Sequence, residues 1–406
     1  MPNQINVSSM SQLYDALANA AGGETILLEG GDYGDMTLTK NSGFDVTFPS
    51  NVTIASADPD NPAVFSGLDL RGASNLTFDG ITFDYEFQLG DKISARPFAL
   101  RDSTDITIRN STFDGDVAHG ISDIDDGYGY AIGLYLWKSA GVNVENNEFF
   151  DFARGTSMKR SSDVTVSGND IHSIRHDAMT FSQMTHAVIE DNYIHDMRGS
   201  LKSNDHRDMI QFWTTDTDAP STDITIRNNH LDIGEGTATQ SIFMGNELVK
   251  TGQAGAEMFY RDIVIEDNVI ANGHWHGITV GETDGLSIRN NSVLHAVVEK
   301  SGGSATIGAP WISVSSVSKD VQIENNATSV IKGEKGQADW SVSNNVFVQD
   351  RDADAPGYYG DVFVSKSLEP VDGVHNFQAA PDGLLYNPPV GATATRSTSD
   401  VSDLAA

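Results

Sequence analysis

The chain contains no cysteine, no long apolar run and few basic side chains. Without cysteine it forms neither disulfides nor a thiolate metal site. No stretch has the length and apolarity of a membrane-spanning segment, and the N-terminus lacks the basic and apolar regions of a signal peptide. We therefore expect no disulfide framework, no membrane partner and no N-terminal signal.

Basic residues are also too few for a nucleic-acid partner. Lys and Arg number 25 against 57 Asp and Glu, a formal net charge of −32, whereas phosphates need a basic footprint. The segment from Arg154 to Arg207 is the exception, with seven Lys/Arg, seven Asp/Glu and five of the 11 His residues. Elsewhere the basic to acidic ratio is 18 to 50. This segment is where we expect an anionic ligand; chance fluctuation of a short window is the alternative.

A short phrase recurs along most of the chain: a strand that ends in a paired polar step, as in ITIRNNHL (224–231) and LSIRNNSV (286–293). One asparagine holds the same place in each phrase: Asn147, Asn169, Asn192, Asn229, Asn268, Asn291 and Asn326. Successive gaps are 22, 23, 37, 39, 23 and 35 residues. A period near 22 with insertions is typical of one turn of a solenoid. We predict that these side chains form a hydrogen-bonded ladder at a bend.

A second strand with period-two alternation precedes each phrase. Its inward positions are predicted to stack from turn to turn: Leu100, Leu136, Met158, Phe181, Phe212, Phe243, Val280 and Val314. Sequential strands of one direction without intervening helices do not form a doubly wound sheet. The prediction is an all-β chain folded as a right-handed parallel β-helix, a solenoid.

Both ends of the chain differ from the repeat. Residues 8–20 have apolar side chains at helical spacing after a serine suited to an N-cap. An open solenoid end needs a cover, because exposed strand edges invite pairing. We predict an N-terminal cap with this helix over residues 1–24, the catalytic β-helix over 25–350, and a C-terminal cap with a linker-like tail over 351–406.

The candidates for catalysis lie on consecutive turns. Asp177 and Asp208 begin equivalent strands, and two nearby carboxyl groups can divide the roles of acid and base. An Asp at that place also caps turns by accepting backbone N–H bonds. The predicted catalytic residues are Lys159, His176, Asp177, Asp208 and Tyr135, with the base among Lys159, His176 and Tyr135.

Other side chains near these strands suit substrate binding. Arg154 and Arg175 are candidate clamps, because a guanidinium matches a carboxylate. Trp137 and Trp213 are predicted to face outward, where aromatic rings stack on sugars. The remaining candidates are Gln211, His206, Arg207, Lys202 and His276. Stacked turns lie about 4.8 Å apart, so Tyr135, Lys159, Asp177 and Asp208 are predicted to share a patch roughly 15 Å long.

A metal site is the least defined part of the prediction. Asp123, Asp125 and Asp126 crowd one loop, and oxygen-rich loops hold calcium. A solvated acidic loop is the alternative. No organic cofactor is expected.

Residues 25–350 resemble the pectin-lyase-like superfamily of right-handed parallel β-helices. HGITVGETDGLSIRNNSVL (276–294) is similar to the catalytic modules of secreted mannuronan C5-epimerases and related alginate lyases. Asp177 in RHDAMTF matches by position an Asp of the epimerase site, whereas the preceding turn has Arg154, Ser157 and Lys159 in place of the Tyr-Gly-x-Asp-Pro-His stretch of that family. The resemblance implies a secreted protein exported without an N-terminal signal.

Residues and resemblance together predict an extracellular, monomeric enzyme that acts on an acidic, uronate-containing polysaccharide as a lyase or C5-epimerase. One alternative is a glycoside hydrolase that uses Asp177 and Asp208 as its carboxyl pair. A second alternative is a non-catalytic glycan-binding surface module. Release of an unsaturated uronate, release of reducing ends, or binding without a product distinguishes the three.

Overall fold

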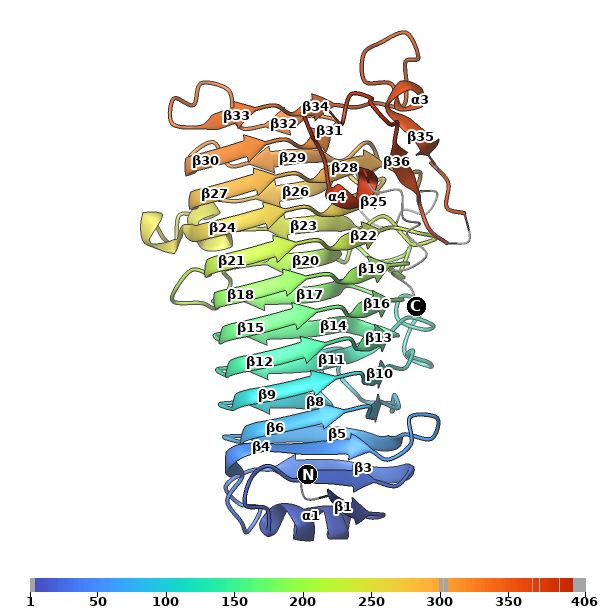
Figure 1. The fold of residues 1–406 in the computed structure, drawn as a ribbon, viewed down its shortest axis with the longest axis vertical. Coiled ribbons are helices and arrows are strands. Elements are labelled where there is room, and N and C mark those ends of the chain that lie inside the picture. The colour runs from blue at the N-terminus through green and yellow to red at the C-terminus, as the bar shows by residue number, and fades with distance from the viewer. Residues whose placement is uncertain are drawn as a thin grey trace. The chain divides into compact units, whose positions relative to one another are not determined.

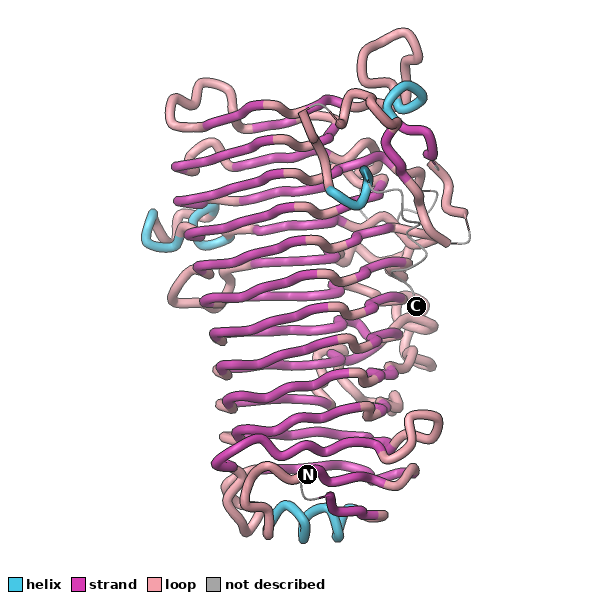
Figure 2. Tube along the Cα trace, viewed as in Figure 1, coloured by secondary structure: helices cyan, strands magenta, loops and turns pink. Residues whose placement is uncertain are grey.

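The computed structural model describes residues 4–298, 302, 306–366, 368–371, 373–386 and 388–396. The chain divides into two compact units, Met1–Arg175 (unit 1) and His176–Ala406 (unit 2). Each unit is built of short parallel strands joined by loops, and its few helices are short (Figures 1 and 2).

The strands of unit 1 lie on three faces. The first face is β1 (Gln4–Val7), β2 (Thr25–Leu28), β4 (Thr47–Ser56), β6 (Ser74–Asp79), β9 (Thr104–Arg109), β12 (Ala140–Glu145) and β15 (Ser162–Ser167). The second is β3 (Gly31–Leu38), β5 (Ala63–Arg71), β8 (Phe98–Arg101), β11 (Tyr130–Trp137) and β14 (Phe152–Lys159). The third is β7 (Thr82–Asp84), β10 (Thr112–Asp114), β13 (Glu148–Phe150) and β16 (Asp170–His172).

Unit 2 repeats this plan. Its first face is β18 (Thr185–Glu190), β21 (Thr222–Arg227), β24 (Tyr260–Glu266), β27 (Thr283–Arg289), β30 (Lys319–Glu324) and β33 (Ser341–Ser343). The second is β17 (Asp177–Ser182), β20 (Asp208–Phe212), β23 (Gln240–Met244), β26 (His276–Val280), β29 (Trp311–Val314) and β32 (Ile331–Lys332). The third is β19 (Tyr193–His195), β22 (His230–Asp232), β25 (Val269–Asn272), β28 (Ser292–His295), β31 (Ala327–Thr328) and β34 (Val346–Phe347).

Neighbours on each face pair in parallel and follow one another by one turn of chain, which is the predicted parallel β-helix. The predicted N-terminal helix is α1 (Met10–Ala18), and the Ser9 side chain caps it by accepting a hydrogen bond from the Gln12 backbone N–H. In unit 2 an insertion carries α2 (Glu247–Lys250) and a short 3₁₀ helix (Ala256–Met258).

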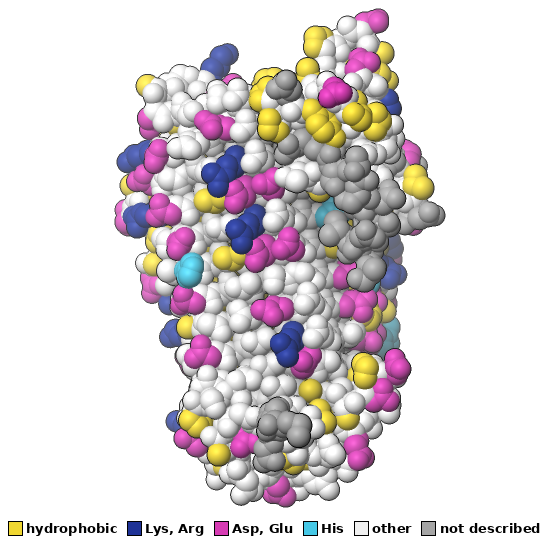
Figure 3. Space-filling view, viewed as in Figure 1, with side chains coloured by type: hydrophobic (Ala, Val, Ile, Leu, Met, Phe, Trp, Pro, Cys, Tyr) yellow, Lys and Arg dark blue, Asp and Glu magenta, His cyan; other side chains and the backbone are white. Residues whose placement is uncertain are grey.

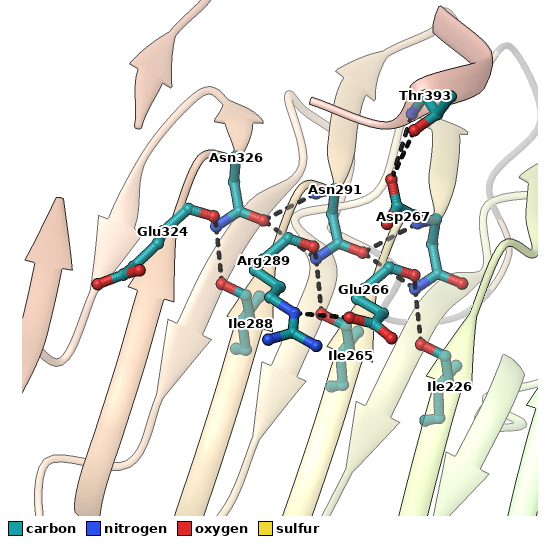
Figure 4. Close-up of polar contacts among 11 residues, drawn as sticks. Ile226, Ile265, Glu266, Asp267, Ile288, Arg289, Asn291, Glu324, Asn326 and Thr393 are labelled. Carbon is teal, nitrogen blue, oxygen red and sulfur yellow. Dashed lines mark hydrogen bonds and ion pairs between the residues drawn. The ribbon is translucent and has the colours of Figure 1, made fainter. Parts of the chain in front are cut away.

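The asparagine ladder is confirmed within each unit. In unit 2 it runs through Asn192, Asn229, Asn268, Asn291, Asn326 and Asn345. Each Oδ1 accepts from the backbone N–H and the side-chain Nδ2 of the asparagine one turn earlier, over 2.9–3.1 Å (Figure 4). In unit 1, Asn147 donates in the same way to Asn169. These bonds satisfy buried amide groups at every bend.

The paired polar step has a backbone cause. The residue before each ladder asparagine adopts a positive φ, as at Asn228 (55°), Asp267 (54°) and Asn290 (56°). Among non-glycine residues, Asn and Asp tolerate this left-handed conformation best. The step therefore turns the chain at a fixed place in every repeat.

The predicted inward stack is correct except at one turn. Leu100, Leu136 and Met158 are in register in unit 1. In unit 2, Phe212 pairs with Met244 and not with Phe243, and the Phe243 side chain faces outward and is half-buried. Two adjacent apolar residues made the alternation ambiguous here. The buried Met244 is the core residue.

Within unit 2, the described part of the C-terminal region packs on the parallel strands. It contains α3 (Tyr359–Val362), the antiparallel pair β35 (Phe363–Lys366) and β36 (Phe377–Ala379), and α4 (Thr393–Arg396). Thr393 bonds to Asp267 (Figure 4), and the buried His375 Nδ1 lies 2.5 Å from Asp232 Oδ1. Residues 397–406, where a linker-like tail was predicted, lie outside the described residues.

Candidate active site

Two buried carboxyl groups lie side by side at the start of neighbouring strands in unit 2. Asp177 begins β17 and Asp208 begins β20, and these strands pair in register through Met179 and Ile210. Asp177 is 2% exposed and Asp208 is fully buried. One ligand atom from each lies within 4.8 Å of the other and of a His206 ring nitrogen. The structure thus gathers three of the predicted site residues.

The His206 imidazole is held from both sides. Its Nδ1 lies 2.7 Å from Asp208 Oδ2 and 3.2 Å from Gln211 Nε2, and its Nε2 lies 3.0 Å from Gln240 Nε2. The His206 side chain is 50% exposed. Asp208 thus lies on the Nδ1 side of the ring and Gln240 on the Nε2 side, so Asp208 orients the ring and His206 is the group that a ligand reaches from the cavity.

Asp208 and His206 together hold a proton at neutral pH. Burial raises the pKa of Asp208 to about 7. The close contact with Asp208 raises the pKa of His206, and the negative charges of Asp177 and Glu247 act in the same direction. Gln240 Oε1 is buried without a hydrogen-bond partner among the described residues. A flip of that amide offers an acceptor to protonated His206, since amide O and N are interchangeable by rotation.

His206 opens on a cavity of about 220 Å³ within unit 2. The polar side chains that line it include Asn204, Asp205, Gln240, His274 and His276. Phe243 lies between His206 and His276. Its ring contacts both imidazole rings edge-on, with centroid distances of 5.5 and 5.3 Å.

The two histidines beside β26 are neutral at pH 7. Burial lowers the pKa of His274 to about 4 and lowers the pKa of His276 as well. The His276 backbone N–H donates to His274 Nδ1 over 3.1 Å, and His276 Nδ1 lies 2.8 Å from Thr279 Oγ1. His276 Nε2 is then the nitrogen left for a ligand. One cavity therefore joins an acid, His206, to a base, His276.

Other predicted residues of unit 2 have structural contacts. His176 is buried, with its Nε2 2.8 Å from Asp205 Oδ2. The buried Arg207 guanidinium donates to the carbonyl oxygens of Ser200 and Ala238. These bonds hold the loop that carries His206. Lys202 is exposed, and Trp213 is half-buried after β20.

The remaining predicted residues lie in unit 1. Tyr135 is buried, with the Arg96 guanidinium carbon 3.8 Å from its ring centroid. Trp137 and Lys159 pair in register between β11 and β14, and Arg154 lies opposite Ile132. Arg175 is 2% exposed and forms an ion pair with Asp125 over 2.8 Å. Since Asp177 and Asp208 belong to unit 2, the patch shared with Tyr135 and Lys159 stays a prediction.

Two of the three carboxylates in the loop proposed for calcium, Asp125 and Asp126, have partners in the protein. Asp126 Oδ1 accepts from the backbone N–H groups of Ile121 and Ser122, and Asp125 pairs with Arg175. Among the described residues, only Asp177, His206 and Asp208 form a group with converging metal-ligand atoms. The 2.7 Å between His206 Nδ1 and Asp208 Oδ2 suits a shared proton, since two ligands of one zinc ion at about 2.0–2.1 Å stand farther apart.

Sequence reasoning missed Gln240. Gln240 pairs in register with Asp208, so its place at the start of β23 was a usable signal. His274 and His276 flank Trp275, but their burial and neutral state follow from packing that the sequence pattern does not show.

A family model described as "Right handed beta helix region" matches residues 18–204 and 98–241, more than half of the chain. The chain belongs to the right-handed β-helix family. This establishes the predicted handedness.

Solved structures resemble this chain at low sequence identity. The Dettilon tailspike protein is 14% identical, with 88% of this chain and 68% of that chain covered and a TM-score of 0.51. PfbA, a surface adhesin of Streptococcus pneumoniae, is 14% identical (84% and 90% covered, TM-score 0.49). An alginate lyase from Paenibacillus sp. str. FPU-7 is 11% identical (84% and 99% covered, TM-score 0.43). No curated protein matches the chain.

No helix among the described residues is long and apolar enough to cross a bilayer. Acidic side chains are scattered over the face in Figure 3 rather than gathered in one patch.

Proposed function

We propose that this β-helix protein is an extracellular, monomeric polysaccharide-active enzyme that modifies a uronate-containing glycan by elimination or by epimerisation at carbon 5. The observation that carries the proposal is the cavity that joins His206, whose pKa is raised, to His276, whose pKa is lowered. Both reactions need one group that removes a proton and another that delivers one.

The reaction begins with proton transfer to His276. Its Nε2 lone pair takes the proton from carbon 5, and the electrons of the broken C–H bond delocalise onto the uronate carboxylate. In elimination this electron pair then forms the C4=C5 double bond as the C4–O4 bond breaks, and His206 gives its proton to O4. In epimerisation the C4–O4 bond stays, and His206 gives its proton to the opposite face of carbon 5.

Positive charge near the base favours an anionic substrate. The Lys332 ammonium helps to lower the pKa of His276, which means that its potential reaches the ring. The same potential attracts the carboxylates of a polyuronate chain to this part of unit 2. We also propose that a calcium ion on the uronate carboxylate would stabilise the negative charge that develops there in the transition state.

The test is incubation of the protein with polymannuronate, polyguluronate, polygalacturonate and neutral glycans. Elimination is expected to produce ultraviolet absorbance from an unsaturated uronate and fragments lighter by one water than hydrolysis products. Epimerisation is expected to change the uronate stereochemistry without a change of mass. Unchanged polyuronates contradict the proposal.

The closeness of Asp177 and Asp208 favours a second candidate, a glycoside hydrolase. Retaining enzymes hold two carboxyl groups about 5–5.5 Å apart, and oxygen atoms of this pair lie within 4.8 Å. The burial of both groups argues against it, because neither reaches a substrate directly. Reducing ends released from a neutral glycan, without absorbance, support the hydrolase.

A non-catalytic glycan-binding module is the remaining alternative. Retention of an acidic glycan on the immobilised protein, with every glycan recovered unchanged, supports that alternative over both enzymes.

A further inference from the structure

A row of rings leads from the cavity toward the later turns of unit 2. Phe243 contacts His276, and the His276 and Trp311 ring centroids lie 6.1 Å apart. The Trp275 and Trp311 rings follow at 4.9 Å with an interplanar angle of 37°. The Lys332 ammonium lies 3.0 Å from the Trp311 centroid.

Strand register explains why these side chains meet. His276, at the start of β26, pairs with Trp311, at the start of β29. Ser313 of β29 pairs with Lys332 at the end of β32. Three successive turns of the second face therefore supply a histidine, an indole and an ammonium.

Two properties of this group point to a ligand. Trp275 is a large apolar side chain with 41% of its surface exposed. Lys332 is exposed, and among the described residues no acidic group lies within ion-pair distance of its ammonium. The indole fixes the position of this cation instead. A positioned cation without an acidic partner is unusual in a chain with 57 Asp and Glu against 25 Lys and Arg.

We propose that Trp275, Trp311 and Lys332 form a binding subsite for an anionic sugar unit, separate from the unit that reacts between His206 and His276. This inference rests on the proposed function. The apolar face of the sugar ring packs on the exposed Trp275 indole, and its carboxylate pairs with Lys332.

The subsite also sets the path of the glycan. From β20 to β32 are four strand spacings of about 4.8 Å, about 19 Å in all. A linear chain that reacts beside His206 thus extends along the second face of unit 2 toward β32. Long substrates engage the subsite, and short substrates that fill only the cavity do not.

The experiment compares wild type with Trp275→Ala and Lys332→Gln on hexamers and dimers of oligomannuronate, oligoguluronate and oligogalacturonate. Phe347→Ala, which removes a ring that is 53% exposed, and Lys319→Gln, at an exposed strand position, are the matched controls. Trp275→Ala is expected to raise KM for the hexamer about tenfold and Lys332→Gln about threefold. Neither is expected to change KM for the dimer, Trp275→Ala is expected to leave kcat for the hexamer unchanged, and the controls should match wild type.

The outcomes separate the subsite from the reaction. If all variants turn over hexamer and dimer with the kcat and KM of wild type, the subsite is overturned and the proposed function stays intact. Equal losses on hexamer and dimer also overturn it, because the residues then act on the reacting unit. If wild type turns over no uronate, hexamer binding by calorimetry that weakens only in Trp275→Ala and Lys332→Gln supports the subsite while the proposed function fails. Unchanged binding overturns both.

Discussion

At the scale of single residues, the Asp208 carboxyl controls the proton affinity of His206. The groups that face His206 are Asp208, Asp177 and Glu247, which raise its pKa, and His274 and His276 across the cavity. Asp208→Asn removes the carboxylate whose contact with His206 contributes most to the raised pKa. His206 then loses its proton at lower pH, so the alkaline limb of the rate profile is expected to move toward acid.

The measurement is the pH dependence of kcat on a polyuronate, with Asp223→Asn as control. Asp223 is exposed, and its positive φ of 57° is one that asparagine accepts. An alkaline limb that stays in place in Asp208→Asn means that His206 is not the titrating acid.

His276 is the proposed base, so its replacement should act on chemistry and not on binding. His276→Asn is expected to lower kcat about 10²- to 10⁴-fold, with oligouronate affinity by calorimetry within about threefold of wild type. His186→Asn at an exposed position is the matched change. Full turnover in His276→Asn removes this residue from the mechanism.

The candidate site could be predicted from sequence only where its residues recur at the same place in successive repeats. Asp177 and Asp208 occupy the same place in consecutive turns, and His206 lies two residues before Asp208, so spacing alone brings them together. The pKa of each group depends instead on burial. Asp208 is fully buried and His206 half exposed, a difference that no spacing reveals. For this reason the sequence predicted Asp208 as a reacting group, whereas the structure makes it a positioning residue for His206.

At the scale of elements, the asparagine ladder joins one turn to the next. Asn268 is fully buried, donates to the Ile226 and Glu266 carbonyls and to Asn291, and accepts from Asn229. Asn268→Ala leaves buried partners without hydrogen bonds, so the free energy of unfolding is expected to fall by about 3 kcal/mol.

Urea denaturation measures this loss. The control is Asn143→Ala, at a half-buried position where the side-chain Nδ2 lies 3.5 Å from Thr107 Oγ1, and the change should stay within about 0.5 kcal/mol. Equal effects of the two substitutions contradict a stabilising role for the ladder.

The prediction of which side chains of a strand face the core failed in one strand. In SIFMGN both Phe243 and Met244 are apolar, and alternation alone does not say which faces the core. Packing decided it, because Met244 continues the column of Phe212 and Val280. The outward Phe243 ring then became the contact between His206 and His276, a feature that the predicted stack had hidden.

At the scale of the whole molecule, the net negative charge disfavours binding of the proposed polyanionic substrate. A formal net charge of −32 repels a polyanion, and the screening length falls from about 30 Å at 0.01 M salt to about 8 Å at 0.15 M. KM for a polyuronate is therefore expected to decrease over this range while kcat stays constant. A KM that rises steeply with salt indicates that attraction to local cations outweighs the acidic body.

The fold was the most predictable property of the molecule, because one 22-residue period with asparagine at a fixed place is enough to specify stacked parallel turns. The reaction was the least predictable. Arg175 and Arg207 were predicted to bind substrate, but both are buried, with Arg175 paired to Asp125 and Arg207 bonded to backbone carbonyls. A count of charges along the sequence does not distinguish such cations from those that reach a ligand.

The most direct test of the central claim is product analysis by mass spectrometry after wild type and His206→Asn are incubated with the three polyuronates. The account predicts that wild type produces an unsaturated fragment or an epimerised uronate and that His206→Asn, folded and still able to bind, produces neither at a comparable rate. Equal product from both proteins, or no product from any polyuronate with wild type, contradicts it.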